Sequence, residues 1–93
     1  MKLELQQLSK THWEPKSEPI NINGGKSQIY ETKKKEYIIE LQTFHIGKDL
    51  RSVSFTFVSP FKGLRDIKTS DLITANRLLQ QIDEFSEIHE TNA

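Results

Sequence analysis

The spacing of apolar residues changes once along this chain. In residues 50–58, Val53, Phe55 and Phe57 alternate with serine and threonine, as expected of a strand with one buried face. Nearer the C-terminus the spacing becomes three and four residues, which is typical of an amphipathic helix. The apolar positions of this predicted helix are Leu72, Ala75, Leu78, Leu79, Ile82, Phe85 and Ile88.

Further strands are predicted upstream of the helix, over residues 2–8, 20–22, 27–32 and 37–46. Asn23-Gly24-Gly25 accepts positive φ and predicts a hairpin turn, and Gly47-Lys48-Asp49 predicts a second one before residues 50–58. Residues 37–46 place apolar side chains on both parities. This pattern favours a central strand that either contains a bulge or is covered on both faces.

Several segments interrupt these elements. Residues 9–19 contain two prolines and predict an irregular loop held by Trp13, and Lys33–Lys35 predicts an exposed turn. After Pro60, the spacing of Phe61, Leu64 and Ile67 predicts one short helical turn. The following segment offers three N-cap residues for the helix, and residues 89–93 are expected to fray. These N-cap candidates are Thr69, Ser70 and Asp71.

The predicted fold class is therefore α+β: a small antiparallel sheet of about four to five strands, packed against one long C-terminal amphipathic helix. A chain of 93 residues is expected to form a single domain over residues 1–93. Only 34 % of its residues are hydrophobic, so the core should be thin. A thin core makes a homodimer a further expectation, because a second copy would cover more apolar surface.

Charge and cysteine content exclude several classes of function. Thirteen basic residues balance thirteen acidic ones, so no overall field draws the chain to nucleic acid or to an anionic membrane. The sequence has no cysteine, which excludes disulfides, thiolate catalysis and cysteine-based zinc sites. No apolar stretch is long enough for a signal peptide or for a membrane span of ~20 residues. We therefore expect a cytoplasmic protein without membrane contact.

No motif predicts catalysis, a cofactor or a metal. The three histidines, His12, His45 and His89, share no local ligand spacing. Gly24-Gly25-Lys26-Ser27 resembles the end of a phosphate-binding loop, but position 20 is isoleucine where that motif needs glycine, and a strand follows rather than a helix. We name no catalytic residue, and we expect a non-catalytic protein.

The leading hypothesis is a small accessory or regulatory protein, such as an inhibitor or adaptor, that acts by contact with a protein partner. Phe61, Leu64 and Arg65 are the predicted partner-binding residues, since an apolar and arginine cluster on a loop has the composition of a binding hot spot. The acidic residues Asp83, Glu84, Glu87 and Glu90 near the C-terminus have no basic neighbour in sequence. This charge could orient an antiparallel dimer or steer a basic partner, and it also fits a frayed helix end.

The alternative hypothesis is a nucleic-acid-binding module that uses basic turns of the sheet. Its candidate residues are Lys33, Lys34, Lys35, Lys48 and Arg51. Acidic residues interleave with the same strands, and the sequence pI of 6.8 is unlike that of a dedicated nucleic-acid binder. Nucleic acid is therefore the second choice.

Overall fold

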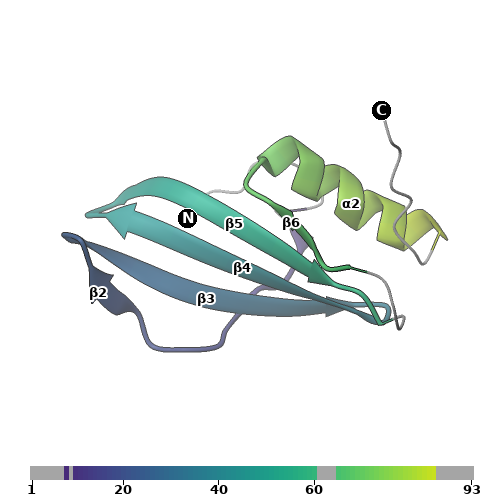
Figure 1. Cartoon of the computed structure of the whole chain (residues 1–93), viewed down its shortest axis with the longest axis horizontal. Coiled ribbons are helices and arrows are strands. Elements are labelled where there is room, and N and C mark those ends of the chain that lie inside the picture. The colour runs from purple at the N-terminus through teal and green to yellow at the C-terminus, as the bar shows by residue number, and fades with distance from the viewer. Residues whose placement is uncertain (1–7, 9, 61–64, 86–93) are drawn as a thin grey trace.

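The computed structural model describes residues 8, 10–60 and 65–85, in which a sheet of six antiparallel strands packs against one helix (Figure 1). The elements are β1 (Glu14–Pro15), β2 (Ile20–Ile22), β3 (Gly25–Lys34), β4 (Tyr37–Ile46), β5 (Asp49–Val58), β6 (Ile67–Thr69) and α2 (Leu72–Phe85). The strand order is β1-β3-β4-β5-β6, and β2 also pairs with β3. The predicted α+β class is confirmed, with short strands at the edges of the sheet.

The turns follow residues that tolerate positive φ. Asn23 and Gly24 have φ values of 47° and 78° between β2 and β3, and Gly47 has a φ of 60° between β4 and β5. Both hairpins are therefore at their predicted positions. The expected turn at Lys33–Lys35 is shorter than predicted, because Lys33 and Lys34 pair with β4 and continue β3. The chain reverses at Lys35, whose φ is 57°.

The central strand is β4, which pairs with β3 on one side and with β5 on the other. Its register with β5 shifts between Phe44 and His45, where Phe44 lies opposite Ser52 and His45 lies opposite Leu50. The extra residue is Arg51 on β5. The prediction of a central strand is confirmed, but the expected bulge within residues 37–46 is not, because the extra residue lies on β5, near the end of the hairpin.

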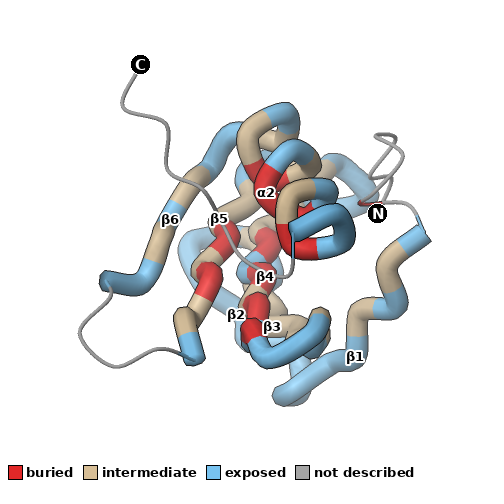
Figure 2. Tube along the Cα trace, turned by 90° about the vertical axis from the view of Figure 1, so that its right-hand side faces the viewer, coloured by how far each residue is buried: buried red, intermediate tan, exposed pale blue. Residues whose placement is uncertain are grey.

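The core lies between α2 and the middle of the sheet, where the buried residues cluster (Figure 2). From the sheet it contains Tyr37, Ile39, Leu41, Phe55 and Phe57, and from the helix Ala75, Leu78, Leu79 and Ile82. These positions repeat every second residue in the strands and every third or fourth in the helix, as the sequence pattern predicts. At one end of the sheet, β2 and the turns beside it extend beyond the helix (Figure 1).

The start of α2 is fixed by Asp71, one of the three predicted N-cap residues. Its Oδ2 accepts hydrogen bonds from the backbone N–H of Thr74 at 2.9 Å and from the Thr74 hydroxyl at 2.6 Å. These bonds stabilise the charged carboxylate, so the pKa of Asp71 lies below its ordinary value. Thr69 adds a contact, because its Oγ1 accepts the N–H of Asp71.

Within residues 10–19 of the predicted loop, Lys10 is helical in backbone conformation, Glu14–Pro15 form β1, and the other residues are irregular. Trp13 holds it as predicted: its ring centroid lies 6.0 Å from that of Phe55, and its Nε1 donates to the Leu8 carbonyl oxygen at 3.4 Å. The strand predicted at residues 2–8 lies outside the described residues except for Leu8, which is buried and helical in backbone conformation.

Two other predictions concern segments that lie wholly or partly outside the described residues. Phe61 and Leu64 belong to these segments, and so does the frayed tail predicted at residues 89–93. The short helical turn expected through Ile67 is wrong at that residue. Ile67 belongs to β6 and pairs with Phe57 of β5. Hydrogen bonding to the free edge of β5 therefore outweighs the local spacing that favoured a helical turn.

Candidate functional site

The face of the sheet opposite α2, which we call the open face, is defined by the strand register. Residues directly opposite each other in antiparallel strands share a face, and neighbours along a strand alternate. Since Ile39 and Leu41 are buried under the helix, Ile38 and Phe44 on the same strand belong to the open face. The register extends this assignment across β2, β3 and β5.

The exposed isoleucines of the strands all lie on the open face. Ile20 and Ile22 pair with Ser27 and Gly25 of β3, and Ser27 pairs in turn with Phe44. Ile38 and Ile46 have the same parity as Phe44 in β4. The exposed fractions are 58 % for Ile20, 47 % for Ile22, 39 % for Ile38 and 41 % for Ile46. An antiparallel sheet can have one solvated face, but that face is usually polar.

Three of these isoleucines gather at one end of the sheet. We call residues 20–27 and 44–52 the hairpin end, because the β2–β3 and β4–β5 turns both lie there (Figure 1). Ile20, Ile22 and Ile46 surround the half-buried Phe44 in the register of the strands. A surface hollow of about 530 Å³ lies beside them, lined by residues 21–26 and Gly47. Ile38 lies at the other end of β4.

Gly25 lets the Phe44 ring reach this cluster. A Cβ atom at Gly25 would lie 2.7 Å from Cζ of Phe44 and 2.3 Å from the backbone oxygen of His45. The φ of Gly25 is not in the left-handed region, so glycine is needed here for close approach and not for backbone conformation. The Phe44 ring therefore lies against Gly25, the β3 residue that pairs with Ile22.

Charged residues lie at the same end of the sheet as the apolar cluster. The charged residues of the hairpin end are Lys26, Lys48, Arg51 and Asp49. Lys26 pairs with His45, so the register places it on the helix side of the sheet, whereas Lys48 lies in the β4–β5 turn and Arg51 is the bulged residue. Arg51 Nη2 lies 4.0 Å from Asp49 Oδ2, a contact at the limit of an ion pair. The hairpin end thus combines apolar residues on the open face with two cations, Lys48 and Arg51, in the adjoining turn and bulge.

The middle of the open face is different because it is acidic. Glu31 and Glu40 lie opposite each other on β3 and β4. Lys16 Nζ lies 3.2 Å from Glu31 Oε1 and 3.9 Å from Glu40 Oε2. The Lys16 ammonium therefore lies close to two carboxylates in the centre of this face. Because these ion pairs are exposed to solvent, they contribute little to stability.

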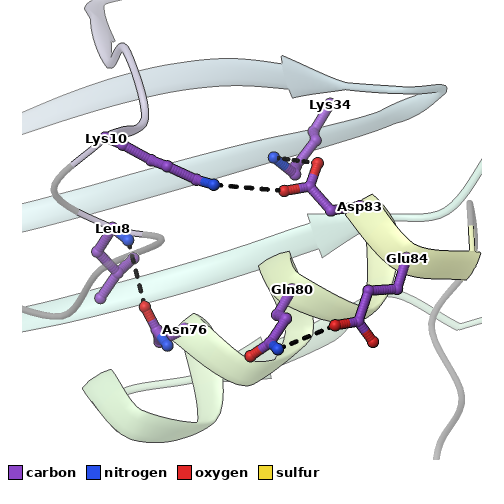
Figure 3. Close-up of polar contacts among 7 residues, drawn as sticks. All are labelled: Leu8, Lys10, Lys34, Asn76, Gln80, Asp83 and Glu84. Carbon is purple, nitrogen blue, oxygen red and sulfur yellow. Dashed lines mark hydrogen bonds and ion pairs between the residues drawn. The ribbon is translucent and has the colours of Figure 1, made fainter.

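A second polar cluster lies where α2 meets the edge of β3, and Figure 3 shows its ion pairs. Asp83 on the helix lies 2.7 Å from Lys34 Nζ and 3.8 Å from Lys10 Nζ, each through a different carboxylate oxygen. The hydrogen bond from Lys34 lowers the pKa of Asp83, although partial burial opposes this shift. Nearby, the Leu8 N–H donates to Asn76 Oδ1 at 3.3 Å.

The sequence-predicted basic residues do not form one surface. Lys33, Lys34 and Lys35 lie at one end of β4, and Lys48 and Arg51 lie at the other. A strand of ten residues separates them, which corresponds to about 30 Å. Glu31 and Glu40 lie along the face between the two groups, so a polyanion that spanned both would meet carboxylates on its way.

Of the predicted partner-binding residues, Arg65 is described and exposed just before β6, while Phe61 and Leu64 lie outside the described residues. Sequence reasoning missed the isoleucine cluster of the hairpin end. The signal was present, since Ile38, Phe44 and Ile46 share one parity along β4. We interpreted this pattern as a bulge or a strand covered on both faces. The sequence alone does not say that α2 covers only one face of β4 and leaves the other exposed.

No group of three metal-ligating side chains comes together within residues 8, 10–60 and 65–85. In the same part of the chain, no helix is both long and apolar enough to cross a membrane. Comparison with protein-family models, with curated proteins and with solved structures found no match for this chain. The arrangement of its own residues is therefore the basis for a functional proposal.

Proposed function

We propose that this protein is a non-catalytic accessory or regulatory module that binds a partner protein through its hairpin end. The observation behind the proposal is the exposure of Ile20, Ile22 and Ile46 on one face of that end. Single exposed apolar residues are ordinary, whereas several that gather around an aromatic ring are typical of interaction sites. A rim of charge around an apolar centre is the usual organisation of a protein interface.

Charge complementarity points to the chemistry of the partner. Lys48 and Arg51 lie beside the isoleucines against the one carboxylate of Asp49, so an acidic amphipathic segment fits this end best. The apolar side chains of this partner segment would cover the isoleucines, and its carboxylates would face Lys48 and Arg51. A second copy of the chain fits less well, because a symmetric contact through this end would place the same cations opposite one another. The absence of cysteine suits a reducing compartment, and we place the interaction in the cytoplasm.

The experiment compares two exposed isoleucines. A photo-crosslinking amino acid is placed at Ile22 in the hairpin end or at Ile73, which is 70 % exposed on α2, and the crosslinked partner is identified from cells. The purified partner is then titrated with the Ile22→Ser/Ile46→Ser double variant and with Ile73→Ser as the matched control. We expect the double variant to lose at least about tenfold in affinity, because interface-centre truncations commonly cost more than 1 kcal/mol each.

Charge and stoichiometry complete the test. Lys48→Gln/Arg51→Gln should weaken the complex at low salt and change its association rate more than its dissociation rate. Crosslinks that form equally at Ile22 and Ile73 would contradict the proposal, as would full affinity of the double variant. If light scattering and crosslinking found only a second copy of this chain at Ile22, the hairpin end would be a dimer interface instead.

A further inference from the structure

The ion pairs of Asp83 form one wall of a second hollow, which the proposed partner surface does not include. It measures about 420 Å³ and lies at the edge of β3, between α2 and the segment that precedes β1. Lys10, Lys33, Lys34 and Asp83 line it together with His12 and two threonines. We call this hollow the cationic pocket. It lies at the opposite end of β3 from the hairpin end.

The pocket has more positive than negative charge. The ammonium groups of Lys10 and Lys34 lie at the single carboxylate of Asp83, while Lys33 pairs with Ile38 and so has its side chain on the open face. Lys34 and Lys10 each approach one oxygen of that carboxylate, at 2.7 Å and 3.8 Å (Figure 3). Lys35, in the adjoining turn, adds to the positive field that acts on Asp83. One carboxylate cannot neutralise this group, so an excess of positive charge remains at the pocket.

We infer that the cationic pocket binds a phosphate group, either free phosphate or the phosphate of a small phosphoester, with Lys10 and Lys34 as its cationic partners. Lysine is a common phosphate ligand because its compact ammonium acts as a point charge with three donors. The volume lies in the range of small-molecule sites and exceeds what a bare ion needs. The hollow therefore has room for part of an attached organic group.

Asp83 acts in this pocket as an internal competitor of the ligand. Its carboxylate takes the ammonium groups that a phosphate would contact, and its negative charge repels the incoming anion. Removal of this charge should therefore strengthen anion binding, even though it breaks an ion pair. A purely structural role for the cluster does not predict that gain.

The test is a titration followed by ¹H–¹⁵N NMR, with chloride used to hold the ionic strength constant. Inorganic phosphate and adenosine monophosphate are the two ligands, and a single-stranded oligonucleotide is the third arm. We expect saturable shifts at Lys10, at residues 32–34 and at Asp83. Asp83→Asn should tighten phosphate binding by about fourfold or more, the effect of one unit charge about 5 Å away in water.

Two further variants keep the inference falsifiable if Asp83→Asn does not fold. Lys34→Gln and Lys10→Gln should each weaken phosphate binding several-fold, and Lys10 makes the longer contact, so its replacement should leave the fold intact. The matched control is Lys48→Gln at the hairpin end, which should bind phosphate as the wild type does. Circular dichroism of each variant verifies folding.

Several results would overturn the inference. Shifts that rise linearly without saturation would show only a general salt effect, and an equal loss in Lys48→Gln would show the same. Weaker phosphate binding by a folded Asp83→Asn would assign the cluster a structural role. Binding of the oligonucleotide without binding of phosphate or the mononucleotide would favour a polyanion surface over a pocket.

Discussion

Replacement of Gly25 by alanine tests the close packing on which the hairpin end depends. The added Cβ would lie 2.3 Å from the backbone oxygen of His45 and 2.7 Å from Cζ of Phe44. The ring could rotate away, but the His45 carbonyl belongs to the central strand, which is paired on both sides. We therefore expect β3 and β4 to separate locally at this point.

The size of the effect follows from two opposing terms. Overpacking typically costs about 1 to 3 kcal/mol, and a clash with paired backbone belongs in the upper part of that range. Alanine also restricts the unfolded chain, which returns about 0.4 to 1 kcal/mol. The net loss in the free energy of unfolding should be about 1 to 2 kcal/mol. For a domain of this size, that corresponds to a fall in Tm of about 4 to 16 °C.

The assay is thermal and urea unfolding of Gly25→Ala beside Gly25→Ala/Phe44→Leu and Gly24→Ala. Gly24 has a φ of 78°, and a Cβ added there would meet no atom within 4 Å, so its replacement tests backbone conformation without a clash. The double variant should recover only the part of the loss that comes from the ring. A Gly25→Ala protein that unfolds at the wild-type temperature would refute the close approach of β3 and β4, and with it the position of Phe44 in the proposed site.

Two further predictions concern the core and the helix start. Leu79→Ala should lower the free energy of unfolding by about 2 to 5 kcal/mol in urea titrations, because Leu79 is fully buried; Ile73→Ala, on the exposed side of the same helix, should stay within about 0.5 kcal/mol of wild type. Equal losses would show that α2 packs in another orientation. Asp71→Ala should lower both Tm and the helical circular dichroism signal, since Thr74 loses its cap. Because the folded-state pKa of Asp71 is lowered from 3.8, its contribution should be complete above that pH and be lost as pH falls through the folded pKa. A difference in Tm between wild type and variant that persists undiminished in acid would contradict the capping role.

The elements whose signals are local can be predicted from the amino-acid sequence alone. The Asn23-Gly24 turn, the alternation of Phe55 and Phe57 and the three-to-four spacing of α2 each depend on residues a few positions apart. Asp71 was among the three N-cap candidates for the same reason. Backbone conformation and side-chain periodicity are properties of short segments, so sequence reasoning predicts them well.

Which surfaces are exposed and which charged groups meet depends on how the elements pack in three dimensions. The helix covers one face of β4, and this choice leaves Ile46 and Phe44 on the open face. The length of β4 separates Lys48 from the lysines of the β3–β4 turn, while the crossing of α2 brings Asp83 to Lys34, far away in sequence. These relations depend on which elements pack together and on their register. A local pattern contains the period of each element but not its partner in the fold.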